Sequence, residues 1–207
     1  MNRAETLPPA FSRFEEMWGV LDFAVFEDAT GSEEEMLAAV PQALGASFTV
    51  DVERLRSLAR RPIPENVFFG DWYDPASGKL LSLGNYITDN GDELQDPKLI
   101  DLSGLRIKSS SAALPEPGAG GQFAYAFSSP PYSLRAMPED IQATFDEIRA
   151  FILPRKTQAE IFDWTDPRLV DVSEYFSAGM EWWGIFLFSI YVPSLRRLTI
   201  VAGSTTD

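Results

Sequence analysis

Carboxylates that neighbour tryptophans are the residues of this sequence whose types and spacing could do chemistry. Three segments have the pattern: Asp71-Trp72, Asp163-Trp164-Thr165-Asp166 and Glu181-Trp182-Trp183. Glycoside hydrolysis uses two carboxylates about 5 to 9 Å apart. The pattern is therefore compatible with a carboxylate-dependent glycoside hydrolase or a sugar-binding protein, with Asp163, Asp166 and Glu181 as the candidate carboxylate site. The competing interpretation is chance, because the chain has 31 acidic residues and Trp is often a core residue.

A second concentration of oxygen ligands lies between residues 88 and 96. The segment contains Asp89, Asn90, Asp92, Glu93 and Asp96, but Gly91 and the acids are out of phase with the calcium-loop pattern. A polar turn is the preferred interpretation, and no metal is expected. The glycine-rich residues 117–121 lack the spacing and the Lys-Ser/Thr end of a phosphate-binding loop.

The absence of histidine and cysteine removes most catalytic chemistry. The 207 residues contain neither type, so Ser-His-Asp and Cys-His arrangements, thiolate chemistry and tetrahedral zinc sites are excluded. Carboxylate chemistry, a Ser-Lys pair or binding of a hard cation by oxygen remain possible in principle. We therefore expect no enzyme, no catalytic residues and no cofactor.

The charge balance instead favours a basic partner. The chain has 17 basic and 31 acidic residues, a formal net charge of -14, which repels nucleic acid and accelerates encounter with a basic protein. Ordinary acidic solubility is the alternative explanation. The acids proposed to bind the partner are Glu33, Glu34, Glu35, Asp71, Asp74, Asp89, Asp92 and Glu93. The basic cluster at Arg54, Arg56, Arg60 and Arg61 is interpreted as helix-end complementarity and intramolecular pairing.

No membrane segment and no secretory signal are predicted. The most apolar run, Trp182 to Val192, is shorter than a membrane span and is followed by Pro193, Arg196 and Arg197. The first residues lack a continuous apolar segment with a cleavage site. We therefore expect a cytoplasmic protein.

Apolar periodicity and capping residues predict several helices. The first is expected over about Arg13 to Phe26, from the capping pair Ser12 and Glu15. Others are expected from the Ser32 cap, with Pro41 kinking or ending that helix, over about residues 51–61, from Pro138 to Pro154, and after Pro167.

The remaining segments predict strands. The DPASG turn is expected to close a hairpin from about Val67 to Ile87, and residues 102–109, 121–127 and 158–164 are expected to be extended. A flexible Pro/Gly loop is expected near 110–121. The last apolar run should form a hairpin covered on both sides. Its faces are expected to be Trp182, Phe186, Phe188 and Ile190 on one side, and Trp183, Ile185, Leu187 and Tyr191 on the other.

These elements favour an α+β fold. Helices interrupt hairpin-linked strands without a regular strand-helix alternation, so a mixed, mainly antiparallel sheet with packed helices is predicted. One domain over residues 1–207 is expected, because 45% hydrophobic residues suffice for one core. The DPASG and final hairpins share Phe, Tyr, Pro and Leu at equal spacing, which we attribute to similar turn requirements rather than to duplication.

The closing segment carries a resemblance to a known class of proteins. Its features are the run from Glu181 to Gly184, the Ile190-Tyr191 strand end and the final residues Gly203 to Asp207. The whole segment, residues 162–207, is roughly a fifth to a quarter of the chain. It resembles the C-terminal part of immunity proteins of bacterial polymorphic toxin systems. The resemblance implies a small cytoplasmic inhibitor that binds a toxin domain without catalysis.

Three hypotheses follow. The first is an acidic immunity protein that neutralises a cognate toxin by masking its active surface. The second is the carboxylate-dependent hydrolase or sugar-binding protein, and the third is a structural or regulatory module. Two carboxylates in one Trp-walled cleft would favour the second hypothesis, whereas separate salt bridges would argue against it.

Overall fold

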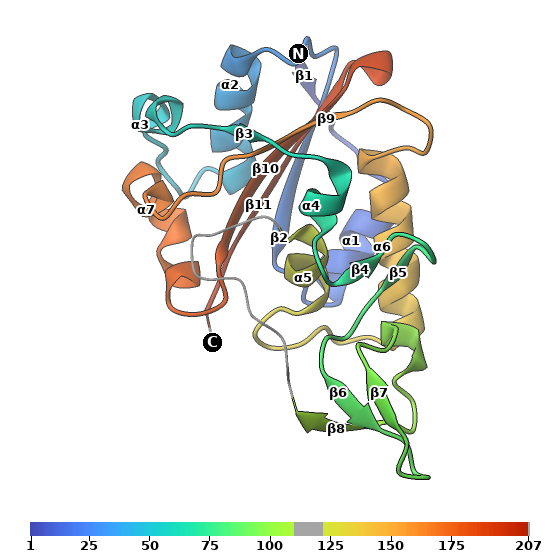
Figure 1. The fold of residues 1–207 in the computed structure, drawn as a ribbon. Helices are drawn as coiled ribbons and strands as arrows, with labels where there is room; N and C mark the ends of the chain where they lie inside the picture. The colour runs from blue at the N-terminus through green and yellow to red at the C-terminus, as the bar shows by residue number, and fades with distance from the viewer. Residues whose placement is uncertain (110–121, 207) are drawn as a thin grey trace.

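A six-stranded antiparallel sheet forms the centre of the protein (Figure 1). The computed structural model describes residues 1–109 and 122–206, so the loop predicted near 110–121 lies outside the described residues. The strands, in spatial order, are β1 Asn2–Arg3, β2 Leu21–Glu27, β11 Arg197–Ser204, β10 Ile185–Val192, β9 Glu160–Asp163 and β3 Arg61–Pro62. Helices pack on this sheet, and the predicted α+β class is confirmed.

The closing hairpin is the central pair of the sheet, as predicted. β10 and β11 pair from Ile185 opposite Ser204 to Val192 opposite Arg197, across the short 3-10 turn η4, Pro193–Leu195. Every residue of β10 is buried. A strand covered on both sides requires two apolar side-chain sets, and this explains why both alternating sets of the run are apolar.

The two tryptophans before β10 depart from the predicted alternation. Phe186 and Phe188 face one core and Ile185 faces the other, as expected. Trp183 packs with Phe186 rather than with Ile185, however, at 4.9 Å between ring centroids. Gly184, with φ of 119°, breaks the extended geometry between them. Trp182 is not part of the core, because 39% of it is exposed.

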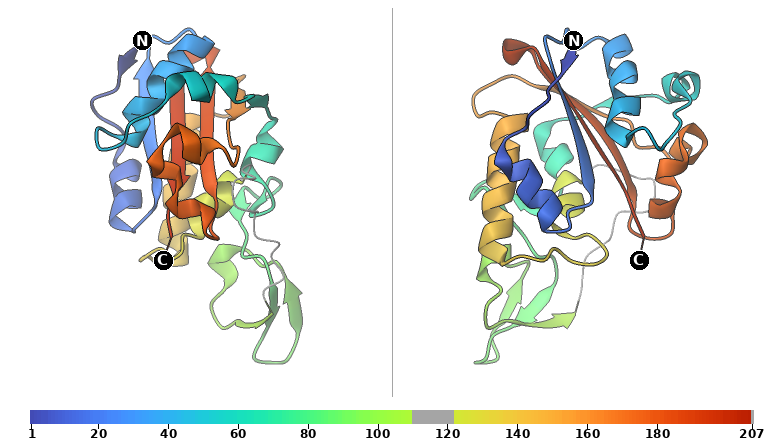
Figure 2. Two further views of the ribbon diagram at one scale, coloured as in Figure 1. Left: turned by 90° about the vertical axis from the view of Figure 1, so that its left-hand side faces the viewer. Right: turned by 180° about the vertical axis from the view of Figure 1, so that it is seen from behind.

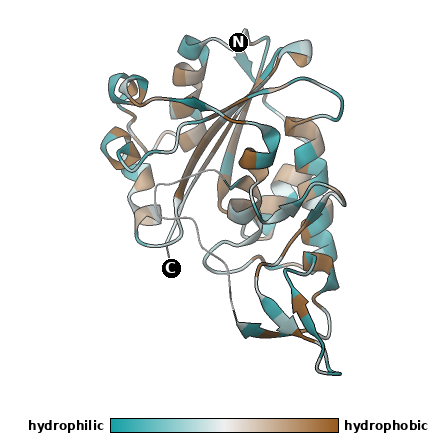
Figure 3. Cartoon of the chain, in the orientation of Figure 1, coloured by the Kyte–Doolittle hydropathy of each residue, from teal (hydrophilic) through white to brown (hydrophobic). Residues whose placement is uncertain are grey.

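Each face of the sheet is covered by its own helices (Figure 2). One face carries α1 Pro9–Glu16, α4 Glu65–Phe69, α5 Phe123–Ser128 and α6 Pro138–Ile152. The other face carries α2 Glu33–Leu44, α3 Val52–Ser57, α7 Leu169–Val172 and the 3-10 turns η2 Glu174–Phe176 and η3 Ala178–Met180. The apolar residues follow this layering, since the central strands and the inward helix faces are hydrophobic (Figure 3).

The predicted helix over residues 13–26 is wrong at both ends, because α1 begins at Pro9, before the Ser12 expected to cap it, and its second half is a strand. Helix α1 ends at Glu16, and residues from Leu21 form β2, which pairs with β11. The amide nitrogens of Trp18 and Gly19 bond the carbonyls of Glu15 and Phe14 and close the helix. A Cβ at Gly19 would lie 2.3 Å from the Phe14 ring. Pairing with the central hairpin then overrides the helical spacing of the apolar residues.

Pro41 does not end helix α2, which was one of the two outcomes expected for it, and helix α3 is shorter than expected. The Ser32 cap is confirmed, because its hydroxyl accepts from the Glu35 amide, but α2 continues through Pro41 to Leu44. Helix α3 ends at Ser57 rather than near Arg61, which already belongs to β3. Helix α6 confirms the helix predicted between Pro138 and Pro154.

The hairpin predicted over residues 67–87 is shorter than expected. Its first part is helix α4, and only β4 Tyr73–Asp74 and β5 Lys79–Leu80 pair around the DPASG turn. Residues 122–127, predicted as a strand, are largely in helix α5. Phe123 and Phe127 are four residues apart, and both enter the phenylalanine core from one helical face.

A small three-stranded sheet projects from one end of the molecule (Figure 1). It consists of β7 Glu93–Gln95, β6 Asn85–Ile87 and β8 Arg106–Ser109, in that spatial order. Along the chain, the 3-10 turn η1 Leu99–Asp101 lies between β7 and β8.

No helix within residues 1–109 and 122–206 is long and apolar enough to cross a membrane.

Candidate functional site: an acidic groove

Two adjoining hollows lie where the short hairpin β4–β5 meets the projecting sheet. Their volumes are about 880 and 580 Å³, and both are lined by Tyr73, Pro75, Leu81 and Asp96. Because they share these walls, we treat them as one surface, named the acidic groove.

Carboxylates and apolar side chains together line the acidic groove. The apolar lining residues are Phe69, Tyr73, Leu81, Leu83, Leu94 and Leu105. The acidic lining residues are Glu65, Asp71, Asp74, Asp96 and Asp101. Lys98 is the basic residue among the lining side chains. The groove therefore combines apolar area with a net negative field.

Two of these acids also accept hydrogen bonds from backbone amides, Asp74 within its own turn and Asp96 from a more distant residue. Asp74 accepts from the Ser77 hydroxyl at 2.5 Å and from the Ala76 amide at 2.9 Å. These hydrogen bonds hold the pKa of Asp74 below its usual value. Asp96, at a φ of 47°, accepts from the Gly84 amide at 2.7 Å. Their carboxylates are therefore fixed in position at the rim.

The wall of the acidic groove is anchored to helix α6. Buried Gln142 accepts from the Leu80 amide at 2.9 Å and donates to the Gly78 carbonyl at 3.4 Å. Tyr73 packs on Phe69 with ring centroids 4.5 Å apart, and burial raises the pKa of its phenol. The hairpin is thus positioned by core contacts, although its strands have two residues each.

The structure brings some of the predicted partner-binding acids to this surface. Asp71 and Asp74 line the acidic groove. Asp89 and Asp92 are exposed on the turn between β6 and β7, and exposed Glu93 begins β7 and pairs with Lys108. Leu94, the next residue of β7, lines the groove. The β6–β7 acids therefore extend the negative surface beyond it.

The other predicted acids lie on α2, across the main sheet from the groove. Glu33 pairs with Arg60 at 3.3 Å, and Glu34 is exposed. Burial alone would raise the pKa of Glu35, but hydrogen bonds from Thr30 and Gly31 lower it below its usual value. Glu35 thus holds the loop that precedes α2, and the structure does not join these acids to the groove.

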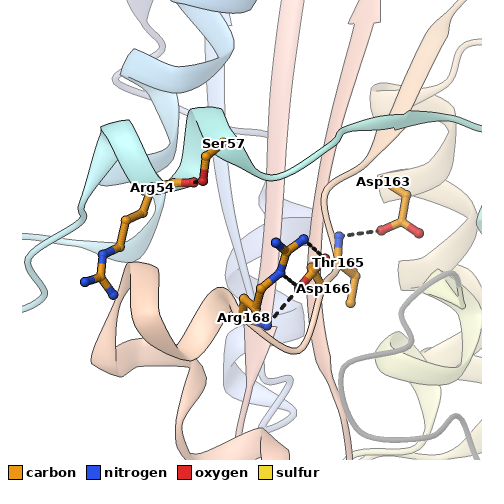
Figure 4. A network of polar contacts seen from close by, with 6 residues as sticks. All are labelled: Arg54, Ser57, Asp163, Thr165, Asp166 and Arg168. Carbon is orange, nitrogen blue, oxygen red and sulfur yellow. Dashed lines mark hydrogen bonds and ion pairs between the residues drawn. The ribbon is translucent and has the colours of Figure 1, made fainter.

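The alternative carboxylate site is divided among separate partners (Figure 4). Asp163, which is 2% exposed, accepts from Arg61 at 2.6 Å and from the Thr165 amide at 2.8 Å. The carboxylate of Asp166 accepts hydrogen bonds from two nitrogens of the Arg168 guanidinium at 2.8 and 2.7 Å. This contact lowers the pKa of Asp166.

Glu181 and the neighbouring tryptophans do not complete a cleft with these two acids. Glu181 accepts from the Thr206 hydroxyl at 2.6 Å. The indole of buried Trp164 donates to Ser189, and that of buried Trp183 donates to the Ser129 carbonyl. Among the lining residues of the acidic groove, none is a member of this carboxylate set. The two buried indoles serve the core rather than an open wall.

The basic cluster near α3 is paired within the chain, as interpreted from the sequence. Ion pairs join Arg54 to Asp51, Arg56 to Glu53, Arg60 to Glu33 and Arg61 to Asp163. Figure 4 also shows the Ser57 hydroxyl donating to the Arg54 carbonyl, which closes the end of α3. The cluster therefore holds α3 and β3 in place.

Sequence reasoning missed Glu65, Asp96 and Asp101 as members of the site. The sequence signal that could have identified them is the presence of apolar residues in otherwise polar segments, namely Leu81, Leu83 and Leu94, which line the same groove.

Within the described residues, no three carboxylates gather where they could hold a metal ion. No family model, curated protein or solved structure matches the chain.

Proposed function

We propose that this protein is a non-enzymatic binding protein of the immunity type, which neutralises a basic toxin domain in the cytoplasm by masking its active surface. The observation that carries the proposal is the acidic groove, which is lined by five carboxylates, one lysine and several apolar side chains. The resemblance of the closing segment to immunity proteins points to the same class.

The two components of the groove have different roles in such binding. Apolar side chains such as Leu81 and Leu83 provide area from which a partner displaces water. The carboxylates raise the association rate and orient the partner, and they disfavour acidic competitors. The formal net charge of -14 extends this steering beyond the contact surface.

The experiment measures association with the toxin domain encoded next to this gene, at several salt concentrations. Asp71→Asn/Asp101→Asn changes two acids of the groove that are exposed. Surface plasmon resonance at low salt should show about fivefold weaker binding for this variant, mainly through a slower association rate.

The matched control removes the same charge from the other side of the sheet. Glu34→Gln/Glu174→Gln alters exposed acids on α2 and η2. It should leave the affinity close to that of the wild type and should preserve the salt dependence of binding. Equal losses in both variants would assign the effect to net charge alone, and no binding at low salt by the wild type would refute the proposal.

A further inference from the structure

A pocket of opposite charge borders the acidic groove at the carboxyl end of α6. It has a volume of about 140 Å³, and three basic side chains line it: Arg149, Arg155 and Lys156. Glu65 is the acid in its lining and also lines the acidic groove. We name this site the basic pocket. Three cations around one small space stand out in a chain with a net charge of -14.

These cations are poorly neutralised by the protein itself. Arg155 and Lys156 are exposed, and within residues 1–109 and 122–206 neither forms an ion pair with a carboxylate. Arg149 reaches Asp146 only at 4.0 Å, and its buried Nε has no hydrogen-bond partner there. Buried donors are nearly always satisfied in folded proteins, and a missing ion or water is one explanation for an exception. The basic pocket thus has donors to offer to an acceptor.

The turn that presents two of the cations is conformationally costly. The Thr157 amide bonds the Pro154 carbonyl, so Arg155 and Lys156 occupy the two central positions of a β-turn. Lys156 has a φ of 63°, a conformation that turns usually assign to Gly or Asn. A non-glycine residue at a positive φ is a reason to ask what its side chain does, and the side chain of Lys156 lines the basic pocket.

The helix end alone does not account for this arrangement. The negative carboxyl end of α6 favours nearby cations, and Arg149 in its last turn already meets that need. The helix end requires neither a shared pocket nor a strained Lys156. A bound anion would explain both, because an oxyanion can accept hydrogen bonds from several cationic donors at once.

We infer that the basic pocket binds a phosphate-sized oxyanion, held by Arg149, Arg155 and Lys156. The volume of about 140 Å³ suits one small anion with little else. The group that fits is a tetrahedral oxyanion, either free or at the end of a small ester. This inference does not depend on the proposed function, since it concerns a different set of side chains.

The test titrates the full chain with inorganic phosphate and, in parallel, with methyl phosphate, at constant ionic strength set with chloride. Calorimetry should show one saturable site, and the thermal midpoint should rise with phosphate concentration because the ligand binds the folded state. The tighter of the two ligands identifies whether the anion is free or esterified.

Variants of the turn separate a specific site from general charge. Arg155→Ala/Lys156→Ala should weaken phosphate binding about tenfold or more, since two charge-assisted contacts are lost. Arg106→Ala/Lys108→Ala removes the same charge from β8 and should not change binding. Lys156→Gly suits the positive φ, and it should weaken binding while the fold retains its stability.

Three results would overturn the inference. They are the absence of saturable phosphate binding, an equal loss in the β8 control, and unchanged binding in the Arg155→Ala/Lys156→Ala variant. If the turn variants lower the thermal midpoint of the phosphate-free protein but leave phosphate binding unchanged, the cations stabilise the carboxyl end of α6 and do not bind an anion.

Discussion

Replacing Asp163 by alanine should destabilise the fold rather than remove an activity. Asp163 is 2% exposed, and its two oxygens accept from Arg61 and from the Thr165 amide. Thr165 is itself 6% exposed, so Asp163→Ala leaves a buried amide without its acceptor. An unsatisfied buried donor costs about 1 to 3 kcal/mol.

The exposure of Arg61 limits the size of this effect. Its side chain is 56% exposed, so the freed guanidinium regains water and does not become a buried unpaired charge. The loss should therefore be about 2 to 3 kcal/mol, below the 3 to 5 kcal/mol typical of breaking a fully buried pair. Asp163→Asn keeps an acceptor for Thr165 and should cost only about 1 kcal/mol.

A double-mutant cycle measures how much of the loss in stability comes from the ion pair between Arg61 and Asp163. Arg61→Ala should cost about 3 to 5 kcal/mol in the wild-type protein, because it leaves the buried carboxylate of Asp163 without its cation. Beside Asp163→Asn it should cost close to nothing, because no carboxylate is then left to neutralise. Chemical denaturation with a common slope provides the free energies of unfolding. If Asp163→Ala changes stability by less than about 0.5 kcal/mol, a size typical of surface substitutions, the structural reasoning is refuted and the alternative carboxylate site regains interest.

Two further perturbations test the packing and the electrostatics. Gly179→Ala would place a Cβ 2.1 Å from the Gly184 carbonyl oxygen, so the free energy of unfolding should fall by about 2 to 3 kcal/mol, and an unchanged denaturation midpoint would contradict the close approach. Burial raises the pKa of Asp22 above its usual 3.8, although the hydrogen bond from Tyr175 partly opposes this. Ionisation of Asp22 is therefore harder in the folded state than in the unfolded state, and this residue's contribution to stability falls as the pH rises above about 4. In denaturation measurements, the free energy of unfolding of Asp22→Asn should therefore rise relative to that of the wild type as the pH increases through this range. A difference between the two proteins that does not change with pH would exclude the effect.

The core of the fold was predictable where the apolar pattern allowed one geometry. The run from Ile185 to Val192 is apolar on both alternating faces, which fits only a covered strand of this length. Helix α6 begins at Pro138 and has apolar residues at helical spacing over four turns. In both segments, local preference and tertiary packing favour the same structure.

Strand β2 and helix α5 were missed because their patterns fit two geometries. Leu21 and Val25 are four residues apart and continue the helical face of α1, yet they occur in a strand. Only the pairing of β2 with β11, more than 170 positions later, decides between the two. Helix α5 shows the reverse case, because alternating Phe, Ala and Tyr residues suggest a strand, while burial on all sides permits a helix.

The candidate site was only partly predictable because it combines distant segments. Asp71 was recognised as an acid, but nothing near it in the sequence indicates that Asp101 lies across the same groove. The backbone of residues 81 and 82 pairs with residues 97 and 98, and this contact folds the second segment against the first. The groove exists only once that pairing has formed.

Asp74 and Asp96 show why acidity alone could not define the site. Asp74 caps its own turn and Asp96 accepts from the Gly84 amide, so each of these acids of the groove also holds the backbone. Their replacement would alter the wall and the charge together, since a backbone amide loses its acceptor. Asp71 and Asp101 have no such structural hydrogen bond in the described part of the chain. The charge of the groove can therefore be tested through these two residues without disturbing its shape.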